Sequence, residues 1–509
     1  MHICYLISLQ VVYKLTTSTD IPKISSIFEI PGAFPITGHL LELGDDHATV
    51  CEVIVINSFE DCKRMLIGNQ SAVIDRPKLY TFHRLISSTQ GFTIGSSPWD
   101  ESCKNKRKAA GQTLGRPAMK GYQAMFDLET YTLIRDLVKD SSGDCGETYL
   151  NPRPYLQRYA LNTTLTLCYG IRMDSVWDDM LREILEVGSA ISLLRILRYL
   201  PNNEKNQRSK SLRDRRDKYF NELLDRVREM IQHGTDKPCV SAAILKDEET
   251  KLTGVEVSSI CLSLVSEGFE TIPGTLTSCL GSLATPEGQV FQERAYEDLK
   301  RHYPNVEDAW KQCLESEDIP YINAIVKEAG RFYTVSSTSL PRKAAVDIPW
   351  DGALIPKGTM ILINAQAGNH EVGHWGADAA TFNPERWLEE LDPPKEKASS
   401  GLQHLSFGAG SRACSGQHIA SRLLYSALVR LLSSFRIVAS PDEPPNTDYV
   451  DYNAIKSALV AIPRDFKVRL ISRDEEALES CLRSGENRTR DAYAERSHGS
   501  GGHGRKLYQ

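Results

Sequence analysis

Residues 405–416, LSFGAGSRACSG, constrain what this chain can fold into more than any other stretch. They surround one cysteine, Cys414, with three glycines, Gly408, Gly410 and Gly416. Glycine reaches positive φ and has no Cβ, so such a loop can bring its backbone close to a bound group. A cysteine thiolate held in this way can be the axial ligand of haem iron. The alternative is a glycine-rich turn before a helix, with an incidental buried cysteine.

The neighbours of Cys414 suit a thiolate ligand. Arg412 lies two residues away and can pair with a haem propionate, and Phe407 can pack beside the sulfur and exclude water. Backbone N–H groups directed at the sulfur would stabilise a thiolate and tune its potential. The helix expected after Gly416 directs its positive N-terminal end toward the same atom. The loop therefore predicts a metal site at Cys414, with Arg412, Phe407 and Gly408 against the cofactor.

The composition of the chain favours one large, mostly helical domain with small β-sheets. Its 509 residues are 41% hydrophobic, and no Gly/Ser-rich or Pro-rich linker and no internal repeat divides them. The net charge of -6 argues against a nucleic-acid partner, which needs a basic surface. Twelve cysteines without a CxxC pair indicate reduced, mostly buried thiols rather than a disulfide framework or a zinc site.

Hydrophobic periodicity predicts the main elements. Apolar residues at helical spacing indicate a central buried helix at 254–284, and β-branched runs with turn signals indicate a small sheet within 334–367. A strand is expected at 53–58, followed by a helix that Ser58 caps. Further helices are expected at 99–142, 153–169, 176–199, 205–233 and 417–436.

The two ends of the chain differ from the region between them. Residues 1–29 carry an apolar run of about a dozen residues, shorter than the ~20 that span a bilayer. We expect them to form a short membrane anchor or the remnant of one. Residues 473–509 are polar, and we expect them to be disordered.

The cysteine loop also matches a known signature. From Phe407 to Gly416 the sequence fills every fixed position of F-x-x-G-x-R-x-C-x-G, so it resembles the haem-binding segment of the cytochrome P-450 family. The resemblance covers residues 30–472. It implies the fold of that family as a single domain, haem b as the cofactor and ligation of the iron by Cys414.

Two shorter motifs agree with this resemblance. Glu328 and Arg331 lie in KEAGR at i,i+3 spacing, which puts both side chains on one helix face, and Arg386 lies in FNPERW. An isolated Glu-x-x-Arg pair is usually a surface ion pair of little energetic value. In the family, the three charged residues form a buried network beneath the cysteine loop, so the resemblance implies a structural role for them here.

The central helix carries SEGFETIPG at residues 266–274, which is similar to the family's Gly-x-Asp/Glu-Thr segment. That resemblance implies that Glu270 and Thr271 relay protons during dioxygen activation. A threonine hydroxyl can bond back to the i−4 carbonyl, and Pro273 removes a backbone donor, so a bend is expected. A bend without any proton role is the alternative. Glu267 stands where the family usually has alanine or glycine.

Further cationic positions follow from the resemblance. Arg342 in LPRKAA stands where the family often binds a haem propionate. Trp99 begins a segment in which the family has Trp-x-x-x-Arg, but the position four residues later is Cys103. Lys104 or Arg107 is the substitute that we expect to reach the propionate.

The resemblance also implies substrate contacts and a branch of the family. By position, Phe269, Val335, Ser336, Ser337 and Leu340 are expected to contact substrate. Several stretches are similar to the fungal phenylacetate hydroxylases and their relatives, which act on small aromatic acids or in natural-product pathways. These stretches are residues 43–50, 70–83, 91–104, 407–425 and 451–469.

The activity implied is that of a haem-thiolate monooxygenase, which inserts one atom of O2 into a small aromatic or secondary-metabolite substrate. Electrons are expected from NADPH through a separate NADPH-cytochrome reductase, because the chain has no flavin-binding or NAD-binding glycine motif. The family implies the cytosolic face of the endoplasmic reticulum membrane, with weak membrane association here.

Two alternatives stay open. One is a haem isomerase or dehydratase of the same fold, which needs no reductase. The other is a degenerate, non-enzymatic haem protein, because about 20 residues that the family has after the position of Glu52 are missing. A sheet without its first strand would have an unpaired edge.

Overall fold

The computed structural model describes residues 53–490, except 142–147, 174, 176–177, 193–202, 248–251, 389–401 and 457. Most of the described chain is helical, as expected. The helices are α3 (Phe59–Lys63), α4 (Glu101–Leu114), α5 (Gln123–Ser141), α6 (Arg153–Tyr169), α7 (Asp179–Ser192), α8 (Asn203–His233), α9 (Val240–Lys246), α10 (Gly254–Ala284), α11 (Gly288–His302), α12 (Val306–Gln312), α13 (Pro320–Tyr333), α14 (Ala365–Asn369), α15 (Val372–Trp375), α16 (Gln417–Ser434) and α17 (Glu475–Thr489).

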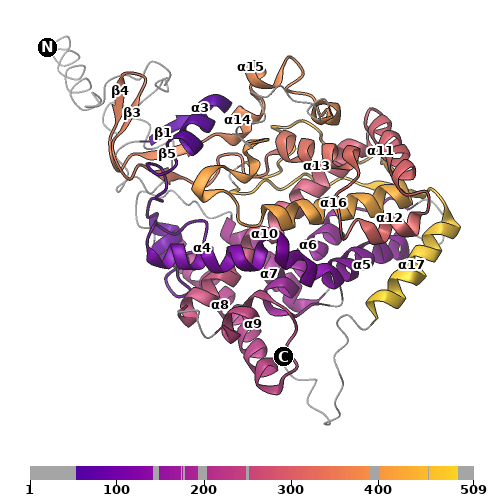
Figure 1. Cartoon of the computed structure of the whole chain (residues 1–509), viewed down its shortest axis with the longest axis horizontal. Helices are drawn as coiled ribbons and strands as arrows, with labels where there is room; N and C mark the ends of the chain where they lie inside the picture. The colour runs from indigo at the N-terminus through magenta and orange to yellow at the C-terminus, as the bar shows by residue number, and fades with distance from the viewer. Residues whose placement is uncertain are drawn as a thin grey trace.

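The helix α10 lies at the centre of the helical body, between α6, α13 and α16 (Figure 1). Its start is a capping box, in which Thr253 and Glu256 satisfy each other's backbone N–H groups. Gly268 lets α6 approach closely, since a Cβ at this position would lie 2.4 Å from Thr164 Cγ2. The helix continues through Pro273, and its buried second half explains the long apolar run in the sequence.

Three small sheets accompany the helices. The strand β1 (Val53–Ile56) pairs in parallel with β5 (Met360–Ile363), which also pairs antiparallel with β2 (Arg342–Lys343). The strands β3 (Ile348–Trp350) and β4 (Ala353–Ile355) form a hairpin, and β6 (Phe435–Ala439) pairs with β7 (Val468–Ser472). The sheet predicted within 334–367 is therefore confirmed.

A second apolar core joins the β1–β5 sheet to the cysteine loop. Ile54 and Ile56 of β1, Phe59 of α3 and Leu405 at the start of the loop are all buried in it. Ser58 caps α3 as predicted, with its hydroxyl accepting from the Asp61 N–H. The strand β1 begins at Val53, so the expected short anchor at 1–29 and the segment missing after Glu52 lie outside the described residues.

The prediction that residues 473–509 are disordered is wrong for residues 475–489, which form α17 beside α5 and α12 (Figure 1). Asp474 caps this helix, and Leu478 and Cys481 are buried residues on its inner face. Arg488 binds Asp127 at 2.8 Å, and Asp127 also binds Arg430. The helix packs through a few apolar residues and through the ion pair of Arg488 with Asp127, and the polar composition of the segment did not indicate either contact.

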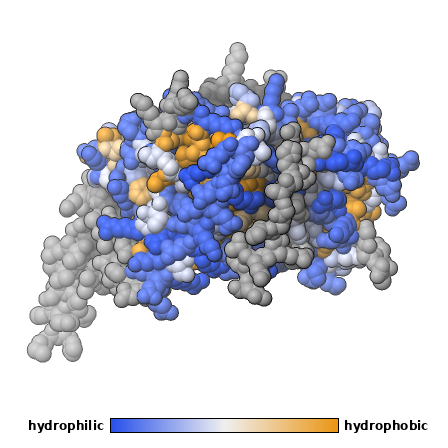
Figure 2. Space-filling view, turned by 90° about the horizontal axis from the view of Figure 1, so that it is seen from below, coloured by the Kyte–Doolittle hydropathy of each residue, from blue (hydrophilic) through white to orange (hydrophobic). Residues whose placement is uncertain are grey.

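The surface seen in Figure 2 is largely hydrophilic, with a few small groups of hydrophobic residues. Within the described ranges, no helix has the length and apolar character needed to cross a bilayer.

Candidate active site

The cysteine loop has the backbone geometry that its glycines suggest. Gly408 and Gly410 both have φ of +64°, and the Cys414 N–H donates to the Phe407 carbonyl at 2.8 Å. Burial, with the nearby Glu267 carboxylate, raises the pKa of the Cys414 thiol to about 11. The N–H groups of Gly416 and the following Gln417 hydrogen-bond toward the sulfur and act in the opposite direction. These are the donors that a thiolate ligand requires.

Gly410 is held by sterics as well as by its φ. A Cβ at Gly410 would lie 2.0 Å from the Leu66 carbonyl oxygen, whereas a Cβ at Gly408 would meet nothing within 4 Å. We expect Gly408→Ala to lower the free energy of unfolding by about 1–3 kcal/mol through φ alone. Gly410→Ala should lose a further ~1–3 kcal/mol through the overlap. Urea unfolding measures both, and equal losses in the two variants would contradict the close approach to Leu66.

The charged residues of KEAGR and FNPERW meet beneath the loop. Arg331 donates to both Glu328 oxygens, from Nε at 2.9 Å and from Nη2 at 2.7 Å. Arg386 Nε lies 3.3 Å from the same carboxylate. The Trp387 indole N–H and the Asn383 backbone N–H also donate to Glu328. Because Glu328 is fully buried, its carboxylate needs such pairing and hydrogen bonding to offset the loss of solvation.

Asn369 connects this network to the cysteine loop. Its carbonyl oxygen accepts from the Leu405 N–H at 2.8 Å, and its amide donates to Ser406 Oγ at 3.2 Å. Arg331 Nη1 donates to the Asn369 backbone carbonyl at 2.7 Å. The network therefore fixes the segment that enters the cysteine loop.

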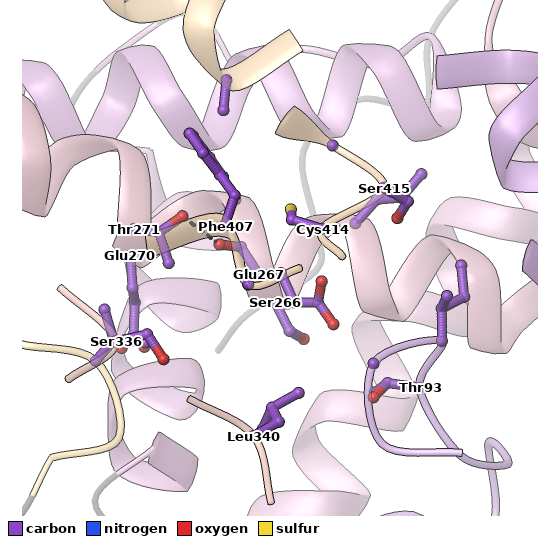
Figure 3. A pocket seen from close by; sticks show the side chains of 18 of the residues that line it. Thr93, Ser266, Glu267, Glu270, Thr271, Ser336, Leu340, Phe407, Cys414 and Ser415 are labelled. Carbon is purple, nitrogen blue, oxygen red and sulfur yellow. Dashed lines mark hydrogen bonds between the residues drawn. The ribbon is translucent and has the colours of Figure 1, made fainter. Parts of the chain in front are cut away.

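The cysteine faces a cavity of about 420 Å³. In Figure 3, Cys414 and Phe407 lie on one side of this space and the α10 residues Glu267, Glu270 and Thr271 border it from the central helix. The side chain of Cys414 is accessible within the cavity, whereas the other described cysteines are buried. A group bound in the cavity can therefore reach the sulfur.

Thr271 makes the hydrogen bond expected of it. Its Oγ1 donates to the Glu267 carbonyl at 2.6 Å, and Thr275 one turn later donates to the Thr271 carbonyl at 2.9 Å. Both bonds connect residues i and i−4, as threonine does inside helices. The hydroxyl oxygen of Thr271 keeps a lone pair that can accept a hydrogen bond from a group in the cavity.

Besides Arg216 of α8, four arginines line the cavity: Arg76, Arg107, Arg342 and Arg412. Their hydrogen bonds go to backbone carbonyls, such as Arg107 to Ala413 at 3.1 Å. Burial, with repulsion from the neighbouring guanidinium groups, lowers the pKa of Arg342 to about 9 and also lowers the pKa values of Arg76 and Arg412. Arg412 Nε is buried without a hydrogen-bond partner.

This cationic set fits the cofactor that the cysteine implies. A haem brings two propionates, and the arginines supply charge and an unused N–H donor for them. Glu267 is the carboxylate among them, and burial raises its pKa to about 7 against the opposing effect of Arg107, Arg76 and Arg412. Gly95 leaves room for it, because a Cβ there would lie 2.7 Å from Glu267 Oε1.

Two residues expected at the site do not line the cavity. Trp99 instead lies beneath the guanidinium of Arg412, with 5.7 Å from Cζ to the ring centroid. Ser337 is exposed, and its carbonyl accepts from the Gln366 N–H, whereas Ser339 lines the cavity. The backbone of Ser339 has φ of +49°, a turn that no periodicity in the sequence indicates.

Four expected substrate contacts do line the cavity: Phe269, Val335, Ser336 and Leu340. The Phe269 ring lies over Gly188 of α7, where a Cβ would be 2.3 Å from Cζ.

Sequence reasoning missed Arg76, which is buried and donates to the Gly95 carbonyl at 3.0 Å. It also missed the cavity wall formed by α7 and α8, because the sequence pattern marks these helices only as amphipathic.

Fold and site together define a haem-thiolate protein. The sequence model of cytochrome P450 matches residues 47–467, and the chain belongs to the cytochrome P450 family. It is 42% identical to the phenylacetate 2-hydroxylase of Emericella nidulans, over 93% of this chain and 95% of the relative. It is 33% identical to the 3-hydroxyphenylacetate 6-hydroxylase of the same organism, over 89% and 90%.

A solved structure supports the same fold. A zebra fish cytochrome P450 determined with progesterone superimposes with a TM-score of 0.68 at 19% identity, covering 91% of this chain and 99% of that one. The family and its hydroxylase members make this chain a cytochrome P450 monooxygenase with haem as its cofactor. The mostly helical fold with small sheets that the resemblance implied is confirmed.

Proposed function

We propose that this monooxygenase hydroxylates a small aromatic acid of the arylacetate type, in fungal aromatic or secondary metabolism. The observation that carries the proposal is the cavity itself, which the accessible Cys414 lines together with Glu270 and Thr271. Phe269, Val335 and Leu340 give this space apolar walls suited to an aromatic ring. The two arylacetate hydroxylases among the relatives support the substrate class.

Each group at the site has a proposed task. When bound, the haem supplies the activation of dioxygen, with one oxygen atom passing to the substrate and the other to water. Cys414 would hold the iron, and Arg107, Arg342 and Arg412 would hold the propionates. Thr271 Oγ1 would accept a hydrogen bond in the cavity and pass on protons that the Glu270 carboxyl supplies.

Electrons would come from NADPH through a separate reductase. A second hollow is lined by Phe407 and Gly408 of the cysteine loop and by the exposed cations Arg116 and Lys120. A reductase docked there would lie next to the loop, and cations would steer an acidic partner. The proposed location is the cytosolic face of the endoplasmic reticulum membrane.

Turnover with phenylacetate, NADPH and a fungal reductase tests the function. We expect hydroxylated product to form, and Thr271→Ala to lower the product formed per NADPH at least about tenfold, because the proton path is broken. Thr277→Ala is the matched control, since Thr277 is buried in the same helix but does not line the cavity. Conversion without NADPH would indicate the isomerase alternative, and a protein that takes up no haem would indicate a degenerate one.

A further inference from the structure

The part of the cavity formed by α8 and by η3 (Tyr80–Ile86) contains hydrogen-bond donors that lack acceptors. Ser87 follows η3 directly and is 2% exposed. Its hydroxyl has no hydrogen-bond partner in the described part of the chain, although the residue lines the cavity. A buried hydroxyl without a partner is unfavourable, unless a ligand satisfies it.

Arg216 of α8 is the positive charge beside this serine. It is 3% exposed and lines the cavity, and its Nη2 donates to the carbonyl of Ile86, the residue before Ser87. Asp217 accepts from Nε at 3.0 Å and from Nη2 at 2.7 Å. Among the described residues, Nη1 donates to no acceptor. Arg216 is thus held rigidly by its neighbours and has one pair of N–H donors to spare.

Tyr219 is the third donor. It lies three residues after Arg216 on α8, so the two side chains share one face of the helix, and it also lines the cavity. Burial raises the pKa of Tyr219, so its hydroxyl stays protonated and able to donate. Within the described ranges this hydroxyl has no hydrogen-bond acceptor.

Several apolar side chains of the neighbouring helices line the cavity together with these donors. Leu167 of α6, Ile184 of α7, Phe220 of α8 and Phe269 of α10 all line the cavity. A ligand with an apolar body and one acceptor group matches this arrangement. A carboxylate is the acceptor best suited to three donors, because its two oxygens accept several hydrogen bonds, including charge-assisted ones from the Nη1 group that Asp217 leaves unused.

We propose that Ser87, Arg216 and Tyr219 form an anion-binding end of the cavity that receives the carboxylate of the substrate. The aromatic body of the substrate lies along the apolar walls toward Cys414. This assignment rests on the proposed function and deepens it, since it names the group by which an aromatic acid is recognised. A neutral ester of the same acid lacks the charge and half of the acceptor capacity.

The test compares phenylacetate with its methyl ester, through the shift of the Soret band when each is titrated into the purified holoenzyme. Ser87→Ala and Tyr219→Phe each remove one donor and keep the rest of the side chain. We expect the acid to bind at least about tenfold more tightly than the ester, and each variant to weaken acid binding about 3–10-fold while ester binding is unchanged. Replacing Arg216 is a less direct test, because Asp217 would lose its partner.

Ser88→Ala is the matched control. Ser88 is the neighbouring serine, but it is exposed and does not line the cavity, so acid binding should be unchanged. The proposal is overturned if the acid and its ester bind with equal affinity, both for phenylacetate and for longer arylalkanoic acids. It is also overturned if the variants weaken the binding of acid and ester equally. A preference for the acid without NADPH-dependent hydroxylation would instead overturn the proposed function and leave the anion site standing.

Discussion

Cys414→Ala is expected to abolish the Soret band of the reduced, carbon-monoxide-bound protein at its thiolate position, together with all hydroxylation. No other described cysteine can replace the ligand, because the others are buried away from the cavity. The described residues also contain no cluster of three His, Cys, Asp or Glu side chains able to hold a metal. The measurement is the difference spectrum of the dithionite-reduced protein with and without carbon monoxide.

A second cysteine variant controls for general damage. Cys481 is a buried residue of α17, a helix that does not contribute to the cavity, so Cys481→Ala should retain the thiolate band. Retention of the band in Cys414→Ala would contradict the assignment of the ligand. Loss of the band in both variants would mean that the fold tolerates neither substitution, and the assignment would then rest on the spectrum of Cys414→Ser.

Glu328→Gln is expected to lower the free energy of unfolding by about 3–5 kcal/mol, because two arginines beneath the loop lose their shared counter-charge. Arg331 is fully buried and loses its carboxylate partner, whereas Arg386 is nearly buried and keeps a second partner in Asp378 at 2.9 Å. Haem content should fall as well, since Arg331 positions Asn369, which in turn holds Leu405 of the cysteine loop.

Urea unfolding and the haem absorbance of the purified protein measure these two effects. Glu101→Gln is the matched control, because the ion pair of Glu101 with Lys104 is exposed and its loss should cost no more than about 0.5 kcal/mol. If Glu328→Gln were as stable as Glu101→Gln, the network would not be what holds the loop.

Local sequence patterns were enough to predict most of the fold and the central residues of the site. The apolar run at 254–284 gives α10 its full length, and the Phe407–Gly416 motif places the accessible cysteine. Contacts between distant segments could not be foreseen. Arg76 is recognisable as a site residue only when its partner Gly95 and the segment at Leu340 are brought beside it.

Two expectations from the sequence were wrong, one at a backbone turn and one in a helix that packs through few contacts. Ser337 and Ser339 differ in reaching the cavity because the chain turns at Ser339, and nothing in the sequence around them indicates this φ. The helix α17 is docked by few residues, among them Leu478 and Arg488, which an average over a polar tail does not reveal.

The pairing of β1 with β5 sets the order in which the protein can mature during synthesis. Val53 pairs with Met360, and Gly410 lies against the Leu66 carbonyl. The N-terminal segments therefore cannot make these contacts until the C-terminal segments have been synthesised. At ~5–20 residues per second, the ribosome needs roughly 15–60 s between residue 53 and residue 363. During that interval the apolar face of β1 has no partner strand in β5. Cofactor capture must therefore be one of the last events in biogenesis.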